Sequence, residues 1–477
     1  MIGSFRQSMT WLHTWAGLVF CWILYFMFVT GTLGYFDTEI DHWMQPEVSE
    51  TAELSAETRT ATALAYLEEH GQGAEQWVVT PGGNRDERHV RVFYRMPAGE
   101  EGEEIVSENV RLSASTGQPL DDAARKTHGG QLLYRMHYVL HYLDRDIAFR
   151  LVGIMTLFMF VGIISGIIAH KKIFKDFFTF RPNKGQRSWL DMHNLLSVSS
   201  LPFQLMITYS GLIFVTVLWM PLIPFASVGF DSQKAAELVE VFNLNVEAAG
   251  TPAPLADVNA IVRDAETVWG GGSVQAIDIR QPGDANAQVL VTRMAGIGAF
   301  PDNRVYDGVS GEYQNEMGVP NAPIGIASVL IGLHEGLFAG PVLRWLYFFS
   351  GLLGTAMVAT GALHWTSKRR RNVPDREQKR GFRFVECLNI GTIVGLPVGV
   401  AAFFWANRLL PVEFAGRADW EVHSMFIVWA ACLLYPLFRP RETAWRELTW
   451  AAAIACAGIP IVNALTTDVH VLASIGR

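Results

Sequence analysis

The sequence has few charged residues for its length. Only 18% of its 477 residues are Asp, Glu, Lys or Arg, whereas 50% are hydrophobic. Such an apolar composition is unusual for a soluble chain and typical of a multi-span membrane protein. The net charge of −8 also gives no sign of a nucleic-acid partner. We therefore expect the chain to contact membrane lipid and no nucleic acid.

Cysteine is scarce too, with 4 residues in the whole chain. All of them lie in or beside apolar segments, where packing is the simplest role and a disulfide framework is not expected. No Cys-x-x-Cys-His motif occurs, which excludes covalent attachment of a c-type haem. Phosphate-binding glycine loops, dinucleotide fingerprints and nucleophile elbows are missing as well. The chain is therefore not expected to hold a nicotinamide or flavin of its own.

Long uncharged runs are what the sequence does contain. About 20 apolar residues suffice to cross a hydrocarbon core roughly 30 Å thick. Seven stretches qualify or nearly qualify: 11–36, 151–169, 195–225, 345–366, 385–405, 422–438 and 448–466. The first is too long and too aromatic for a cleaved signal peptide, and no small-residue cleavage site follows it. The sequence therefore predicts an all-α polytopic membrane bundle of about seven transmembrane helices.

Basic residues in the loops orient these spans. The loop 171–189 contains six Lys or Arg residues, and the loop 367–383 contains eight. Because cytoplasmic loops carry an excess of Lys and Arg, both loops are expected to face the cytoplasm. The N-terminus is then cytoplasmic, the two long acidic loops are exterior, and the C-terminus is exterior.

One order of parts occurs twice along the chain: a span, an exterior domain, a span and a basic loop. The first copy comprises 1–36, 37–147, 148–170 and 171–189, and the second comprises 190–225, 226–340, 341–366 and 367–383. We interpret this as a duplicated two-helix unit. The remaining residues, 384–477, add three spans without a counterpart. A scaffold, a dimer surface and a docking site are all open roles for them.

Each exterior domain shows a helical run followed by alternating strand patterns. In the first domain these are a helix at 57–70 and strands at 76–80, 89–95 and 105–113. In the second they are a helix at 255–269 and strands at 274–280, 288–292 and 303–306, followed by a turn at 310–312. We expect two small α+β modules, each with one helix on an antiparallel sheet.

Four histidines occupy matching positions at the ends of the apolar runs. His13 and His193 each lie eighteen residues before a glycine, and His170 and His364 each lie twenty residues after an arginine. Ionisable groups at bilayer depth are costly and mark functional sites, and neutral imidazole is a common axial ligand of haem iron. Although a single histidine at an interface is more often a polar anchor, matched pairs predict haem b held between facing helices.

Equivalent positions of a duplicated unit approach each other around a pseudo-twofold axis, which suggests the pairs. His13 pairs with His193 at the cytoplasmic end. At the exterior end His141 pairs with His334, because they precede the matched arginines by nine and ten residues. His137, one helical turn before His141, remains a rival. The sequence thus predicts two haems, one near each membrane face.

For several other residues at the span ends, more than one role is open. His170 and His364 could replace the first pair, hold a third haem or bond to propionates. Arg150 and Arg344 stand at the outer ends of two spans, as propionate partners or as snorkelling anchors. Glycines preceded by Ser or Thr recur at equivalent depths, for close helix packing or for clearance of a porphyrin face. They are Gly31, Gly166, Gly211 and Gly361.

Four stretches resemble the PepSY-associated transmembrane helix family: Trp-Leu-His-Thr-Trp-Ala-Gly-Leu at 11–18, the basic motif at 170–182, Trp-Leu-Asp-Met-His-Asn at 189–194, and 201–211. The resemblance covers roughly residues 1–370. It implies PepSY-like periplasmic domains in a bacterial inner membrane. Some relatives are haem-containing ferric-siderophore reductases, while others carry a flavin reductase module that is absent here. By likeness, the family recurrently has histidine at His13, His193, His141 and His334.

The expected function is that of an inner-membrane di-haem b-type cytochrome. It would pass electrons from a cytoplasmic reductase or a quinol to a periplasmic acceptor, and the resemblance favours ferric siderophore iron. Reduction would release that iron, because hard oxygen ligands hold the softer ferrous ion less well. Two alternatives stay open: a non-enzymatic protein that binds or restrains a periplasmic protease or envelope factor, and a metal transport component.

Overall fold

The computed structural model describes residues 3–48, 54–85, 87–97, 106–120, 124–170, 172–215, 229, 231, 233–234, 245–271, 274–294, 296–370 and 380–470. The chain forms two compact units. The helical unit comprises Met1–Pro46, Arg125–Trp219 and His334–Arg477, and the sheet unit comprises Glu47–Ala124 and Met220–Leu333. Residue 105 of a predicted strand and residues 216–225 of a predicted span lie outside the described residues.

The described part of the helical unit contains six helices long and apolar enough to cross a membrane. They are α1 (Phe5–Gly34), α5 (Arg145–Ala169), α14 (Pro341–Arg370), α15 with α16 (Arg380–Ile393 and Gly395–Leu409), α17 with the short η2 (Arg417–Leu434 and Tyr435–Leu437) and α18 (Arg441–Thr466). Each matches one predicted span. The expectation of a mostly helical, multi-pass membrane protein is therefore confirmed.

The remaining predicted span, 195–225, is not one straight helix. Its described part belongs to α7 (Gln186–Ser199) and α8 (Leu201–Phe214), which meet at an angle of 68°. Pro202 stands in the first turn of α8, where a missing N–H costs nothing but where the preceding helix cannot easily continue. His193 and Gly211 therefore lie on different helices, unlike His13 and Gly31, which share α1.

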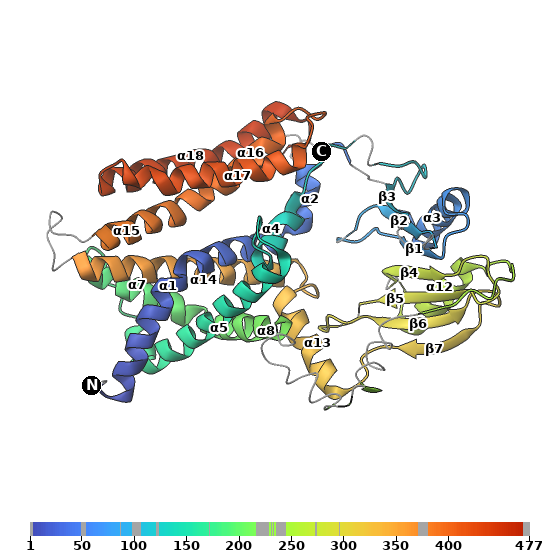
Figure 1. The fold of residues 1–477 in the computed structure, drawn as a ribbon, viewed down its shortest axis with the longest axis horizontal. Helices are drawn as coiled ribbons and strands as arrows, with labels where there is room; N and C mark the ends of the chain where they lie inside the picture. The colour runs from blue at the N-terminus through green and yellow to red at the C-terminus, as the bar shows by residue number, and fades with distance from the viewer. Residues whose placement is uncertain are drawn as a thin grey trace. The chain divides into compact units, whose positions relative to one another are not determined.

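Helix α1 is the centre of the helical unit. It packs against α5, α14 and the short helix α4 (Gly129–Tyr138), and α14 packs in turn against α7 (Figure 1). Leu24 and Met27 of α1, Met155 of α5 and Met357 of α14 belong to one buried cluster. Three other short helices were not predicted. They are α2 (Asp37–Met44), α6 (Ile173–Asp176) and α13 (Ala322–Glu335).

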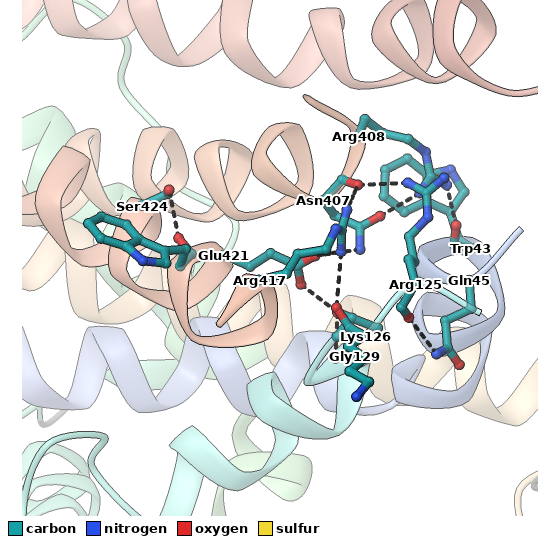
Figure 2. Close-up of polar contacts among 12 residues, drawn as sticks. Trp43, Gln45, Arg125, Lys126, Gly129, Asn407, Arg408, Arg417, Glu421 and Ser424 are labelled. Carbon is teal, nitrogen blue, oxygen red and sulfur yellow. Dashed lines mark hydrogen bonds and ion pairs between the residues drawn. The ribbon is translucent and has the colours of Figure 1, made fainter. Parts of the chain in front are cut away.

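The C-terminal helices are tied to the rest of the helical unit by a buried polar cluster (Figure 2). Arg417 and Glu421 of α17 form an ion pair, and Arg417 also donates to the backbone carbonyls of Lys126 and Asn407. Arg408 of α16 lies over the Trp43 ring with its guanidinium carbon 3.8 Å from the ring centroid. The cluster thus holds both segments at which the first long loop leaves and rejoins this unit.

The described strands of the sheet unit form one antiparallel sheet. Its strands are β1 (Gln76–Thr80), β2 (Val90–Arg95), β3 (Ser107–Leu112), β4 (Ala276–Arg280), β5 (Gln288–Arg293), β6 (Asp302–Asp307) and β7 (Tyr313–Met317). Their order is β3-β2-β1-β4-β5-β6-β7 (Figure 1). The predicted strands are present, but β7 was missed because its side chains are polar and mostly exposed.

The expectation of two separate modules is wrong, because β1 pairs with β4 and joins both segments. Helices α3 (Ala56–His70) and α12 (Val258–Trp269) share one core with the strands. Val79 of β1 and Ile277 of β4 lie opposite each other and are fully buried in that core. Without this pairing, β1 and β4 would each be an exposed apolar edge strand, which soluble domains avoid.

We expect a disulfide to form between β1 and β4 after the substitutions Val78→Cys and Asp278→Cys. These residues are direct cross-strand partners. Such partners have Cα atoms about 4.5–5.5 Å apart, within disulfide range. Non-reducing electrophoresis of the oxidised full-length protein measures the cross-link. The pair Val78→Cys and Gln314→Cys is the control, because β7 lies four strands from β1, or about 19 Å. Equal cross-linking of both pairs would contradict the single sheet.

The substitution Glu421→Ala should strongly destabilise the protein, since it leaves the buried Arg417 guanidinium without its carboxylate. Breaking a buried ion pair from one side costs about 3–5 kcal/mol. Thermal unfolding of the detergent-solubilised protein should show a clear drop in Tm. The control is Glu447→Ala, which removes the more exposed partner of Arg439 and should change Tm little. A Tm unchanged in both variants would contradict a structural role for the cluster.

Candidate haem-ligating histidine pairs

Four histidine rings of the helical unit lie together in two pairs. The rings of His13 on α1 and His193 on α7 have centroids 6.2 Å apart. The rings of His137 on α4 and His334 on α13 have centroids 6.0 Å apart. All of these side chains are partly buried. The structure therefore brings together the first pair expected from the sequence and one of the two alternatives for the second.

The structure corrects the expected partner of His334. His141 instead stacks on Phe426 of α17, with ring centroids 5.8 Å apart. His137 and His334 are each the last residue but one of a short helix, α4 and α13. The arginines used for counting lie at different depths in the next helices, since Arg150 is the sixth residue of α5 and Arg344 the fourth of α14. Alignment on the ends of the short helices would have selected His137.

The Nδ1 atoms of three of these histidines bond to backbone carbonyls of a neighbouring helix. His13 Nδ1 lies 2.8 Å from the Gly162 oxygen, His193 Nδ1 2.9 Å from the Met357 oxygen, and His137 Nδ1 2.8 Å from the Met27 oxygen. A carbonyl can only accept, so Nδ1 carries the proton and donates. The lone pair of each imidazole is therefore on Nε2, the atom available to a metal.

His334 follows the same rule through a hydroxyl. Its Nδ1 lies 3.1 Å from Ser210 Oγ, and this hydroxyl donates its own hydrogen to the Met206 carbonyl at 2.7 Å. Ser210 Oγ must then accept from Nδ1–H. The ring also makes a backbone hydrogen bond at Ile207. All four imidazoles are thereby held in one tautomer.

A glycine faces each of the four rings. A Cβ atom on Gly31 would lie 2.5 Å from His137 Nδ1, and one on Gly166 would lie 2.9 Å from His13 Cε1. On Gly211 it would lie 3.0 Å from His334 Cε1, and on Gly361 3.1 Å from His193 Cε1. The recurring glycines of the sequence are thus the residues that make room for the histidines.

The surroundings of the four glycines follow one pattern. The backbone carbonyl that meets each imidazole belongs to the residue four positions before the glycine: Met27, Gly162, Ile207 and Met357. The hydroxyl of the Ser or Thr directly before the glycine lies within hydrogen-bond distance of the same carbonyl, although those of Thr30, Ser210 and Thr360 donate at a shorter distance to the carbonyl one residue earlier. The distances to the shared carbonyl are 3.3 Å from Thr30, 3.1 Å from Ser165, 3.2 Å from Ser210 and 3.0 Å from Thr360. Sequence analysis found these Ser-Gly and Thr-Gly pairs but not their role.

The two pairs fit the axial positions of a metal. Metal–imidazole bonds are about 2 Å long, so a metal between two facing imidazoles places the ring centroids on the order of 6 Å apart. Two imidazoles are too few to enclose a bare transition metal, whereas they are the two ligands that porphyrin-bound iron needs. Among the described side chains, no group of three or more His, Cys, Asp or Glu residues is placed to hold a metal ion.

A cavity of about 970 Å³ surrounds the His13–His193 pair. This is within the size range of cofactor-binding pockets. Its lining is mostly apolar and includes residues of α1, α5, α7, α8 and α14. Arg6, Lys368 and Arg369 supply positive charge, which suits the propionates of a haem. The cavity therefore matches a large, flat, mainly apolar group with an anionic edge.

The other predicted residues make different contacts. His170 Nε2 lies 3.0 Å from the Asn194 amide nitrogen, and His364 Nδ1 lies 3.3 Å from the Gln186 carbonyl. Both line the large cavity. Arg344 bonds to Glu39 of α2 at 3.3 Å, whereas Arg150 is exposed. The structure places neither arginine in a described contact with a paired histidine.

A polar pair beside the second histidine pair was missed by sequence reasoning. The Tyr134 hydroxyl donates to Glu335 Oε1 at 3.1 Å. Tyr134 lies one helical turn before His137, and Glu335 directly follows His334. The available signal was the helical spacing of Tyr134 and His137, which became visible only once α4 was recognised as a helix.

Comparison with known proteins identifies one family. Residues 10–368 match the model described as the PepSY-associated TM region. This range contains all four paired histidines and all four facing glycines. The resemblance seen in the sequence is therefore confirmed. A comparison with curated proteins found no match.

Proposed function

Because the chain belongs to the PepSY-associated transmembrane family, and because the matched region contains both histidine pairs, we propose that it is a di-haem b-type membrane cytochrome. His13 and His193 would hold one haem, and His137 and His334 the other. Haem supplies a one-electron couple of ferric and ferrous iron when it is bound. The protein's part is to hold the imidazoles and to exclude competing ligands.

The observation that carries this proposal is the shared Nδ1 arrangement of the four rings. Metal-ligating histidines almost always donate their other ring N–H to a carbonyl, a carboxylate or water. Each paired histidine here donates in that way, which leaves Nε2 unprotonated. Histidines that serve only as polar anchors have no need of the same tautomer in four places.

The placement of the pairs suits electron transfer across a membrane. On α1, His13 belongs to one pair, and Gly31 faces the other. These positions are eighteen residues apart, about 27 Å at 1.5 Å per residue. That is close to the thickness of a hydrocarbon core, roughly 30 Å. With both axial positions filled by protein, such sites favour electron transfer over binding of oxygen.

We propose that the protein lies in a bacterial inner membrane with both basic loops in the cytoplasm. Electrons then leave at the His137–His334 end for a periplasmic acceptor. Chelated ferric iron, such as a ferric siderophore, is the acceptor that the family membership favours. Its reduction to the softer ferrous ion weakens its bonds to hard oxygen donors, so the iron is released. The activity is that of a membrane ferric-chelate reductase.

The purified protein should contain about two haems per chain with a b-type spectrum. Substituting either His13 or His193 by Ala should remove one haem, and substituting either His137 or His334 should remove the other. Reduced-minus-oxidised absorption spectra and pyridine haemochrome analysis give the haem content. His141→Ala is the matched control, because this ring stacks on Phe426 and should leave both haems in place.

Two results would overturn the proposal. A wild-type protein without a dithionite-induced b-type signal would remove the cytochrome function and favour a binding or regulatory protein. Loss of the exterior signal in His141→Ala, with retention in His137→Ala, would reject the pairing.

The substitution Gly31→Ala should disturb the exterior site alone. The added methyl group would lie 2.5 Å from His137 Nδ1, so the ring must move and its bond to Met27 must weaken. We expect a loss or spectral shift of one haem, while the signal of the other stays unchanged. Gly340→Ala, directly before α14, is the control, since its Cβ would meet nothing within 4 Å. Identical spectra for both variants would contradict the role assigned to Gly31.

A further inference from the structure

A second cavity of about 230 Å³ lies in the helical unit beside the first. It is lined by Trp189 of α7, Arg370 of α14, Glu386 and Asn389 of α15, and Arg441 and Trp445 of α18, among other residues. Two indole rings and several polar groups therefore face a space large enough for one substituted six-membered ring. The helices that lack a counterpart in the repeat provide half of its walls.

Two polar groups of this cavity, Glu386 and Asn389, are buried at one end of the membrane-spanning helices, whereas the Arg370 and Arg441 side chains are 22% and 36% exposed. Glu386 is 7% exposed and Asn389 1%, and Arg370 forms an ion pair with Glu386. Ionisable groups within membrane helices are functional by default. This pair is therefore a candidate for binding and proton exchange.

The two cavities share walls formed by α7 and α14. Trp189 lines the small cavity, and His193, four residues later on α7, lines the large one. Four helical residues span about 6 Å along the axis. Asn389 also donates to the carbonyl of Ala362 at 3.4 Å, and Ala362 follows Gly361, the glycine that faces His193. A ligand in the small cavity lies one helix away from the His13–His193 site.

We propose that this cavity binds the head group of a membrane quinol and that electrons enter the protein here. The inference rests on the proposed cytochrome function. A quinol is dissolved in the lipid, its flat ring can stack on an indole, and its two oxygens need polar partners. Arg370, Asn389 and Arg441 are donors, and Glu386 is an acceptor. A phospholipid phosphate is disfavoured, because the two arginines of the cavity are each paired with a carboxylate, Arg370 with Glu386 and Arg441 with Glu442.

Quinol oxidation at this site is a two-electron, two-proton reaction. Oxidation of one quinol to a quinone breaks two O–H bonds and releases two electrons and two protons. The two electrons would be taken up by the haems that the two histidine pairs would hold, one each: the first would enter at the His13–His193 site and move on to the His137–His334 site, which leaves the entry site free for the second. One proton goes to the Glu386 carboxylate, and the other goes to water at the basic-loop end of the helices. No further oxidant is needed.

The test uses the full-length haem-loaded protein in liposomes of quinone-free phosphatidylcholine. Decylubiquinol is added, and reduction of the haem is followed by its absorption near the α-band. Wild type should be reduced, whereas Glu386→Gln should be reduced at least tenfold more slowly. Ser367→Phe, which fills the cavity without removing a charge, should have the same effect. Glu447→Gln, in the more exposed ion pair with Arg439, should behave as wild type.

Dithionite should reduce every variant completely, which shows that haem is bound and the chain is folded. Binding is measured separately, by quenching of tryptophan fluorescence with decylubiquinone, and both cavity variants should bind it at least tenfold more weakly. Wild type that dithionite reduces but decylubiquinol does not would overturn the quinol site and leave the cytochrome intact. Unchanged rates in both cavity variants would also overturn it. Absence of haem would instead overturn the proposed cytochrome function. The fluorescence assay would then still show whether the small cavity binds decylubiquinone.

Discussion

The interaction on which the structure depends is an imidazole N–H donating to a helix carbonyl beside a glycine. In an α-helix each side chain tilts toward the N-terminus and covers the turn before it. The carbonyl four residues before a given position is therefore normally shielded. Glycine removes that shield, so His137 can reach the Met27 carbonyl across Gly31. The hydroxyl of Thr30 lies 3.3 Å from the same carbonyl and makes a shorter hydrogen bond, 2.9 Å, to the Phe26 carbonyl.

This interaction also decides which helices touch. His13 brings α1 to Gly166 of α5, and His193 brings α7 to Gly361 of α14. In the second pair, His137 brings α4 to α1, and His334 brings α13 to α8. Helix α1 contributes a histidine near one end and a glycine near the other. The residues that pack the bundle are thus the residues that position the rings, so the site cannot be altered without altering the packing.

Much of the fold could be predicted from sequence, namely the elements that depend only on a pattern of neighbouring residues. Run length gave the spans, and alternation gave six of the seven described strands. The pairing of β1 with β4 could not be predicted, because an apolar strand such as 76–80 does not specify which edge it meets. The bend after Ser199 was missed because the apolar pattern continues through Pro202. His141 was preferred to His137 because the residue positions were counted from two arginines that lie at different depths in their helices. In addition, α4 had not been recognised as a helix.

The His137–His334 pair differs from the His13–His193 pair in where its histidines lie along the chain. His13 and His193 lie within their helices, α1 and α7, whereas His137 and His334 are each the last residue but one of α4 and α13. The sheet unit ends at Ala124 before α4, and it ends again at Leu333, the residue directly before His334. His137 and His334 therefore both follow a return of the chain from the sheet unit. The buried cluster around Arg417 holds the first of these returns through Lys126 and Arg125. The C-terminal helices thus fix the entry to α4 and, through α15 and α18, also complete the small cavity at the opposite end of the bundle.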